Sequence, residues 1–356
     1  MKKTAYLKAI TIIIATFLLL ASCGGAEARY VSDSFFAMDT LIEVKLAKGT
    51  ADSANIFAEC RRIAAELDAM LSAENGASEI ARFNMSGEGC NVSREVGEVF
   101  LAARSVWLAS GGAFDPTTYP ATLLWRAGSA AGTLPSDDEI SCAAAKNGME
   151  LIDYDEASGF LAKSQPWVML DLGGVGKGYA EEKVIEYLGA TDAAYGVLSF
   201  GGNISVFGSH PRGDFRIALR DPSGNGYAGD ISVTSGYVSV SGGYERYYEI
   251  DGRKYCHIID PASGIPVDGA IESAAVISAN GAAADALSTA LFVSGTVDAM
   301  LELYSSQKGT ALEFEAILIY ENEIYITPGL EGFFTLSCGR TLKTAGGEAA
   351  NKPENK

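Results

Sequence analysis

The sequence has little of what several common binding sites require. Among 356 residues there are two histidines, His210 and His257, and the six cysteines include no C-x-x-C pair, which speaks against a zinc site built from clustered ligands. Basic residues are also scarce, because 27 Lys and Arg accompany 45 Asp and Glu and give a formal net charge of −18. This charge argues against a nucleic-acid partner, which needs a basic face, and against electrostatic attachment to anionic lipid.

The first 22 residues differ in composition from the rest of the chain. Residues 1–8 (MKKTAYLK) are positively charged, and residues 9–21 (AITIIIATFLLLA) form an apolar run that is short for a membrane-spanning helix. We therefore expect a secretory signal. Residues 20–23 (LASC) resemble a bacterial lipobox, in which Cys23 becomes the lipidated first residue. A plain signal peptide with an incidental cysteine is the alternative. The lipobox predicts a protein of the bacterial cell envelope, anchored to a membrane without spanning it, on the periplasmic or extracytoplasmic face.

The remaining chain mixes helical and strand patterns without strict alternation, which favours the α+β class. Residues 23–30 are expected to be a tether, 31–340 one domain, and 341–356 a disordered polar tail. Apolar spacing and capping residues predict four main helices, at 51–72, 92–110, 177–188 and 280–295. Short strands are expected between 151 and 260, including residues 167–174 (WVMLDLGG), and residues 316–330 are expected to form a late hairpin.

Residues 171–184 (DLGGVGKGYAEEKV) contain four glycines within six residues, followed by a helical run. The stretch is not a P-loop and does not match G-x-G-x-x-G. It nevertheless predicts a strand, a glycine loop and a helix start, an arrangement in which backbone N–H groups meet an anion. Lys177 adds a positive charge there. The alternative is a plain strand-to-helix turn.

A second candidate stretch is residues 283–291 (AADALSTAL). Asp285 and Thr289 are four residues apart, so they share one face of the predicted helix. That face is otherwise Ala and Leu, where an unpaired carboxylate would be costly to bury. Carboxylate and hydroxyl oxygens suit Mg²⁺. Alternatively, Asp285 faces solvent and the Thr289 hydroxyl bonds back to the helix.

A third stretch, residues 254–267 (KYCHIIDPASGIPV), places His257 and Ile259 on one face of a predicted strand, before a turn. A single histidine on a strand is usually structural. With only two histidines in the chain, however, one at the end of a strand beside a glycine turn is also a candidate for chemistry.

Eight motifs in this order resemble the ApbE family of FAD:protein FMN transferases. They are FFAMDT, SEIARFN, GGAFDPT, DLGGVGKGYA, SFGGNI, SVSGGYERYY, HIIDPASGIPV and AADALSTAL, and they span about residues 30 to 335. The resemblance implies one compact α+β unit related to the T-fold, with antiparallel sheets, flanking helices and an active site in a cleft between two lobes. It also implies Mg²⁺-dependent cleavage of FAD, with FMN transferred to a Thr or Ser of an acceptor protein and AMP released.

The resemblance also assigns roles by motif position. It makes His257 the general base. It assigns the Mg²⁺ ligands to the Gly174 carbonyl, Asp285 and Thr289. The FAD contacts that it implies are Met38, Ala113, Phe114, Asp115, Asp171, Lys177 and Ile259.

Two questions stay open at this stage. The same residues would serve an FAD pyrophosphatase that uses water as nucleophile, or a flavin-binding lipoprotein without turnover. No convincing flavinylation motif occurs in this chain, so an acceptor would be a separate protein. The chain also departs from the family pattern, because Glu74 stands where many members have a Tyr that stacks on the nucleotide. Either another aromatic ring substitutes, or FAD binds more weakly.

Overall fold

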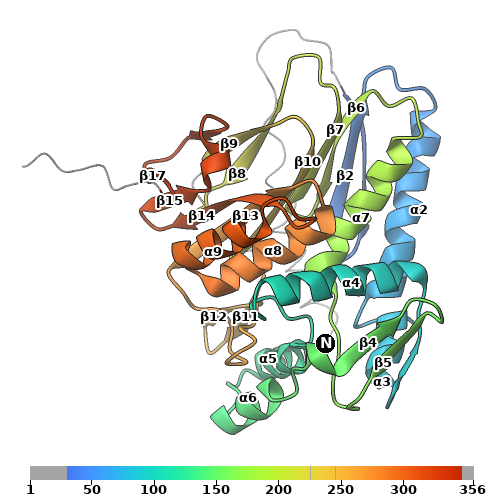
Figure 1. The fold of residues 1–356 in the computed structure, drawn as a ribbon, viewed down its shortest axis with the longest axis vertical. Coiled ribbons are helices and arrows are strands. Elements are labelled where there is room, and N and C mark those ends of the chain that lie inside the picture. The colour runs from blue at the N-terminus through green and yellow to red at the C-terminus, as the bar shows by residue number, and fades with distance from the viewer. Residues whose placement is uncertain (1–29, 225, 245, 347–356) are drawn as a thin grey trace, which may run out of the picture.

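A computed structural model describes residues 30–346 except residues 225 and 245. The fold is α+β, with helices on one side of a large sheet and smaller sheets around it (Figure 1), as predicted. The predicted signal, Cys23 and most of the tether lie outside the described residues. Within residues 30–346, every helix is too short or too polar to cross a bilayer.

The large sheet has nine strands, and nearly all neighbours are antiparallel. Their order is β1 (Tyr30–Ala37), β2 (Thr40–Ala47), β6 (Tyr195–Phe200), β7 (Asn203–Gly208), β10 (Gly236–Gly242), β13 (Ile271–Ser278), β14 (Phe314–Tyr320), β15 (Glu323–Ile326) and β17 (Thr341–Thr344). The last pair, β15 and β17, is parallel. The predicted hairpin at 316–330 is present as β14 and β15.

The central strands are covered on both faces. In β14, Ala316 and Leu318 lie in the main core with the helices, whereas Ile317 and Ile319 lie in a second core on the opposite face. Successive side chains of a strand point to opposite faces, so a strand buried on both sides needs an unbroken apolar run. This explains the sequence AILI at the start of the late hairpin.

The helices pack against one face of the large sheet, and three small sheets complete the fold. The helices are α2 (Ser53–Leu71), α3 (Glu79–Met85), α4 (Arg94–Ala109), α5 (Tyr119–Ala131), α6 (Asp137–Ala144), α7 (Gly173–Leu188), α8 (Gly281–Ser294) and α9 (Val297–Gln307), with 3₁₀ turns at Met149–Leu151 and Pro328–Leu330. The small sheets are β8 (Phe215–Arg220) with β9 (Tyr227–Val233) and β16 (Phe334–Leu336), β3 (Gly89–Asn91) with β5 (Phe160–Lys163) and β4 (Ile152–Asp155), and β11 (Tyr247–Ile250) with β12 (Arg253–Cys256).

Three expectations about local structure were wrong. Residues 341–344 do not belong to a disordered tail, because Thr341–Thr344 pairs with β15 as β17; residues 347–356 lie outside the described part of the chain. Residues 167–172 form no strand, since the Asn84 side chain, rather than a neighbouring strand, bonds both the N–H and the C=O of Leu170, at 2.7 and 2.8 Å. Helix α7 begins at Gly173, four residues before the predicted start.

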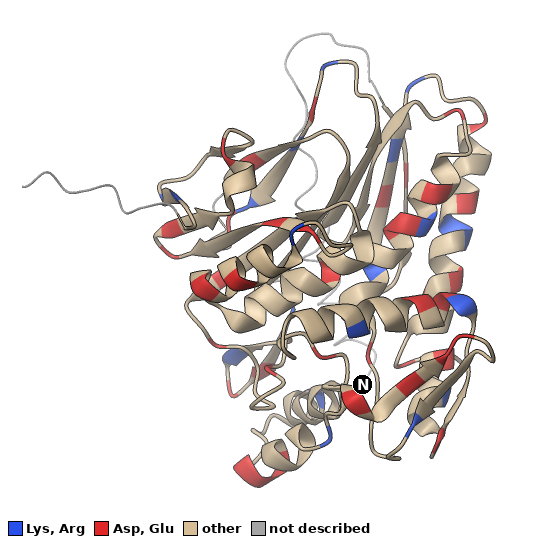
Figure 2. Cartoon of the chain, in the orientation of Figure 1, with Lys and Arg blue, Asp and Glu red and all other residues tan. Residues whose placement is uncertain are grey.

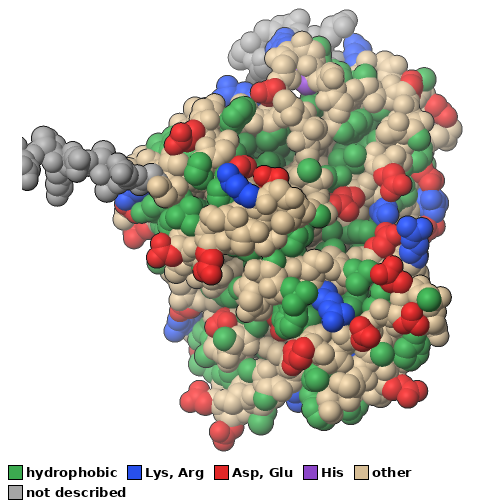
Figure 3. All heavy atoms as spheres, viewed as in Figure 1, with side chains coloured by type: hydrophobic (Ala, Val, Ile, Leu, Met, Phe, Trp, Pro, Cys, Tyr) green, Lys and Arg blue, Asp and Glu red, His purple; other side chains and the backbone are tan. Residues whose placement is uncertain are grey.

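Acidic side chains are spread over the helices and loops (Figure 2). On the face shown in Figure 3, Asp and Glu lie scattered among apolar groups, with single basic residues between them. On this face the net negative charge is thus distributed over the surface rather than gathered in one patch.

Candidate functional site

The site is built around the point where α7 meets α8, and glycines permit that contact. A Cβ on Gly178 would clash with the carbonyl oxygen of Gly281, and a Cβ on Gly281 would lie 2.5 Å from the carbonyl oxygen of Gly178. The two helix starts can therefore touch through their backbones only because both residues lack side chains. The glycines of residues 171–184 are the first turns of a helix, not the predicted loop before it.

This contact brings Lys177 of α7 to Asp285 of α8. The Lys177 Nζ lies 3.3 and 3.4 Å from the two carboxylate oxygens of Asp285, and the Gly178 N–H donates to Asp285 Oδ2 at 3.1 Å. Asp285 is 4% exposed, so the alternative of a solvent-facing Asp is wrong. A buried carboxylate is stabilised by a paired cation and hydrogen bonds, and both are present here.

Thr289 lies one turn further along α8 and faces the same region. Its Oγ1 lies 3.2 Å from Ser241 Oγ of β10, and a Cβ built on Gly174 would lie 3.8 Å from it. The same Cβ would lie 3.0 Å from the Phe114 ring. The predicted ligand residues Gly174, Asp285 and Thr289 and the predicted flavin contact Phe114 are therefore brought together.

These residues fit a hard divalent cation. They supply one buried carboxylate, one hydroxyl and the backbone of a glycine, all oxygen donors of the kind Mg²⁺ prefers. The Lys177 ammonium already places a positive charge beside the carboxylate. In residues 30–346 no group of three or more Asp, Glu, His or Cys side chains forms a metal cluster, but a set with a single carboxylate would not produce one.

Asp171 and Asp115 lie at the entrance to α7, in two segments that bond to each other. The Asp171 N–H donates to the Pro116 carbonyl at 2.8 Å, and Asp171 Oδ1 accepts the Gly173 N–H at 2.9 Å. Asp115 Oδ1 accepts both the N–H and the hydroxyl of Thr117, at 2.7 and 2.6 Å. Burial raises the pKa of both carboxyl groups. The two segments flank the helix start where an anion would bind.

His257 follows directly after β12, which ends at Cys256, rather than lying within a strand. Its Nδ1 lies 3.0 Å from the carbonyl oxygen of Arg246, which also accepts the His257 N–H at 3.3 Å. A carbonyl can only accept, so Nδ1 carries the proton and Nε2 keeps its lone pair. Burial lowers the pKa of His257 to about 4, against an opposing contribution from the Arg246 carbonyl, and the charges of Arg246 and Lys177 lower it further.

This pKa predicts the pH dependence of any reaction in which His257 takes a proton. The neutral imidazole is the base, so we expect the rate to be nearly flat from pH 6 to 8 and to fall by half near pH 4, rather than near the ordinary value of about 6.5. Initial rates between pH 4 and 8 test this. The unfolded chain binds this proton more readily, so folding stability also falls as the pH drops from about 6.5 towards 4, and unfolding must be followed in parallel. A fall in rate centred near pH 6.5 would show that His257 keeps its ordinary pKa and would contradict this prediction.

Met38 occupies a two-residue turn between β1 and β2. Both turn residues, Met38 and Asp39, have positive φ angles of 52° and 56°, as a type I′ hairpin requires. This backbone is costly for residues other than glycine and is typical of functional positions. The Met38 N–H donates to Asp68 Oδ2 at 2.9 Å, and a Cβ on Gly176 would lie 3.5 Å from the Met38 methyl. The turn thus touches the start of α7.

Ile259 differs from the other predicted site residues. It is 5% exposed and its side chain packs with Trp125 and Ile250 in a small core under α5. A contact with FAD would therefore come from its backbone. Ala113 lies in the segment between α4 and α5 and is partly buried against the main core.

Glu74, at the departure from the family pattern, forms an ion pair with Arg126 of α5 at 2.6 Å. Arg126 and Glu74 both influence the charge of Asp171 and of Tyr248, so this pair stands close to the predicted FAD contacts. Tyr248 is a partly buried ring in the same group, and burial raises its pKa to about 12. Tyr119 lies near the same charges, and its hydroxyl donates to the Ala73 carbonyl at 3.3 Å, so two aromatic residues stand near Glu74.

Glu74→Tyr is expected to tighten FAD binding. Stacking of a base on an aromatic ring contributes about 1–3 kcal/mol, whereas an exposed ion pair contributes about 0–1 kcal/mol. We therefore expect the Kd for FAD to fall by about tenfold, measured by flavin fluorescence. Glu74→Gln removes the ion pair without adding a ring and is the matched control. An unchanged Kd in Glu74→Tyr would show that the position does not face the nucleotide.

Several polar residues of the site were not found from the sequence. Glu182 accepts the Gly281 and Ala282 N–H groups, at 2.5 and 3.1 Å, and so caps α8. Arg246 orients His257 and also bonds the Asp39 carbonyl at 3.0 Å. The partners of Glu182 and Arg246 lie 11 to 207 residues away in the chain. A short sequence motif therefore cannot predict these two residues as part of the site.

The site thus combines a helix contact made through two glycines, a buried carboxylate paired with a lysine, and a histidine, on an α+β scaffold. A model of the ApbE family matches residues 38–313, so the chain belongs to the ApbE family, and its members here are transferases. The FAD:protein FMN transferase of Treponema pallidum is 28% identical over 321 residues, covering 83% of this chain and 87% of that protein. The FAD:protein FMN transferase of Vibrio cholerae is 31% identical over 293 residues, covering 80% and 87%. The crystal structure of the ApbE protein of Thermotoga maritima superposes with a TM-score of 0.77 at 26% identity, covering 85% of this chain and 99% of that one.

Proposed function

We propose that the protein is a Mg²⁺-dependent FAD:protein FMN transferase. It cleaves the pyrophosphate of FAD and attaches FMN through a phosphoester to a Thr or Ser of an acceptor flavoprotein, with AMP released. The observation that carries the proposal is the convergence of Lys177, Asp285 and Thr289 on the start of α7, in a chain whose relatives are named as transferases of this kind.

Asp285, Thr289 and the Gly174 carbonyl would hold the Mg²⁺ ion. When bound, the ion supplies a positive charge that offsets the charge developing on the pyrophosphate oxygens. An acidic protein that binds an anionic dinucleotide needs such a centre. Lys177, already paired to Asp285, adds a second positive charge at the same point.

The protein residues carry the proton and the positioning. The acceptor hydroxyl oxygen forms a bond to the FMN phosphorus while the bond from that phosphorus to the bridging oxygen breaks, and the electron pair leaves with AMP. His257 Nε2 takes the hydroxyl proton, because Nδ1 is held by the Arg246 carbonyl. General-base catalysis of this kind contributes on the order of 10²–10⁴-fold.

The N-terminal sequence supports a proposal for where the protein acts. We propose that Cys23 is lipidated and anchors the protein to a membrane of the bacterial cell envelope, on the periplasmic or extracytoplasmic side. The acceptor is then a flavoprotein of the same compartment that carries a Ser/Thr flavinylation motif.

Product analysis tests the proposal. Purified protein is mixed with FAD and Mg²⁺, with and without an acceptor flavoprotein domain, and the products are separated by HPLC. We expect AMP and protein-bound FMN only when the acceptor is present. Equal amounts of AMP and free FMN without acceptor would instead show an FAD pyrophosphatase, and bound FAD with no AMP in either sample would show a flavin-binding protein without turnover.

A further inference from the structure

Strand β1 is an edge of the large sheet, and its backbone is open along that edge. Among the described strands it pairs only with β2, from Tyr30↔Ala47 to Ala37↔Thr40. The residues that flank a two-residue turn form a hydrogen-bonded pair, so every second residue before it directs its N–H and C=O away from the partner. These outward residues are Ser32, Ser34 and Phe36, and within residues 30–346 their outward backbone groups have no hydrogen-bond partner.

An exposed apolar pair lies at the end of this edge. Phe36 and Leu41 stand opposite each other across the hairpin and are 72% and 55% exposed. In a non-hydrogen-bonded pair the side chains are close, so the two form one apolar patch. An open strand edge is a template for pairing with another chain, and the apolar patch lies at one end of this one.

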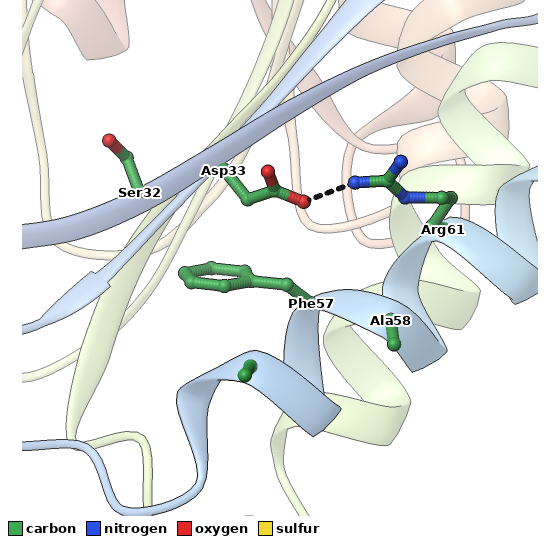
Figure 4. Close-up of a pocket in the computed structure, with 6 residues that line it drawn as sticks. Ser32, Asp33, Phe57, Ala58 and Arg61 are labelled. Carbon is green, nitrogen blue, oxygen red and sulfur yellow. Dashed lines mark hydrogen bonds and ion pairs between the residues drawn. The ribbon is translucent and has the colours of Figure 1, made fainter.

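The edge also borders a shallow hollow against helix α2. Figure 4 shows Asp33 of β1 pointing towards Arg61 of α2, with Phe57 below the strand, and the two charged groups are 2.7 Å apart. The hollow is lined by Ser32, Asp33, Ala54, Phe57, Ala58 and Arg61. A strand edge beside a helix is the geometry in which extended peptides add to a sheet.

The end of this edge is linked to His257 through Arg246. β1 runs into the Met38–Asp39 turn, and the Arg246 guanidinium donates to the Asp39 carbonyl at 3.0 Å. The Arg246 carbonyl in turn holds His257 Nδ1 at 3.0 Å. One residue therefore joins the end of the open edge to the group that takes the acceptor proton.

We propose that an extended segment of the acceptor protein adds to β1 as a further strand and so delivers its Thr or Ser hydroxyl to His257. The inference rests on the proposed function. A Thr or Ser oxygen is one bond from Cβ, so the acceptor backbone must pass close to the FMN phosphorus. Strand addition holds that backbone by main-chain hydrogen bonds, and an apolar side chain of the segment covers Phe36 and Leu41.

The sharpest test removes one outward N–H. Ser34→Pro deletes the outward donor but no bond to β2, because proline is tolerated on an edge strand where its nitrogen faces outward. Ser34→Ala keeps the donor and is the matched control. With FAD, Mg²⁺ and an acceptor flavoprotein domain as the probe, we expect the KM for the acceptor to rise at least about tenfold in Ser34→Pro, with Kd for FAD unchanged.

A second variant protects the test against misfolding. If Ser34→Pro does not fold, the double variant Phe36→Ser and Leu41→Ser, which alters only exposed side chains, must raise the acceptor KM. An acceptor KM equal to that of the control in the folded variants overturns the strand-addition proposal and leaves the transferase intact. A change in sedimentation alone, with an unchanged KM, would assign the edge to a second copy and also overturn it. Absence of protein-bound FMN in the unmodified protein would refute the proposed function itself.

Discussion

Asp285→Ala is expected to lower Mg²⁺-dependent turnover by about 1,000-fold, because it removes the single carboxylate of the predicted metal ligands. The carboxylate also accepts the Gly178 N–H and pairs with Lys177, so its loss leaves the Gly178 N–H without this acceptor and Lys177 without its ion-pair partner. The measurement is AMP release from FAD as a function of Mg²⁺ concentration. Asp285→Asn keeps the side-chain shape and should show nearly the same loss, since charge is what the ion requires.

The control for this experiment is Asp298→Ala. Asp298 is an exposed acid in the first turn of the neighbouring helix α9, and its replacement should leave both rate and Mg²⁺ dependence unchanged. Thermal unfolding of each variant separates loss of the site from loss of the fold. Turnover in Asp285→Ala within about tenfold of the unmodified protein, at the same Mg²⁺ midpoint, would remove Asp285 from the metal site.

His257→Ala is expected to slow FMN transfer by about 10²–10⁴-fold while FAD binding changes little. The imidazole contributes a lone pair on Nε2 and is held from the other side by the Arg246 carbonyl, so removing it deletes a proton acceptor rather than a pocket wall. The single-turnover transfer rate should therefore fall while the Kd for FAD stays nearly the same. Added imidazole should restore part of the rate, a recovery that a purely structural histidine would not show.

The matched control is the other histidine. His210 packs against Tyr195 and Phe215, with ring centroids 5.2 Å apart in each case, so His210→Ala should affect stability and not transfer. If His257→Ala abolished FAD binding in a protein that remained folded, His257 would be a binding residue and another base would have to be found.

The sequence was most informative where one segment contains its own pattern. The i, i+4 spacing of Asp285 and Thr289 and the caps at Asn280 and Gly295 predicted α8 and its polar face, and the structure has all of them. The glycine-rich run predicts a loop between a strand and a helix start, and helix propensity alone would not make it helical, because glycine disfavours helices. The run is helical, and its Gly178 packs against Gly281 of α8. Neither segment contains a sequence signal that predicts contact with the other.

The strand predicted over residues 167–174 failed for a similar reason. The segment is largely apolar, but a single amide side chain, Asn84, bonds the backbone of Leu170 in place of a neighbouring strand. Hydrogen bonds between residues 86 apart cannot be read from periodicity. The same limit hid Arg246 and Glu182, whose value to the site depends on which distant backbone groups they reach.

The Gly178–Gly281 contact depends on the absence of a Cβ atom at both positions, and this contact sets the distance between α7 and α8 at the site. A methyl group at either position would push α7 from α8, and Lys177 and Asp285 would separate although neither had changed. The distance between Lys177 and Asp285 thus depends on two positions that contribute no functional side chain. Substitutions intended to change the site therefore cannot be placed at Gly178 or Gly281, because neither position has room for a Cβ atom.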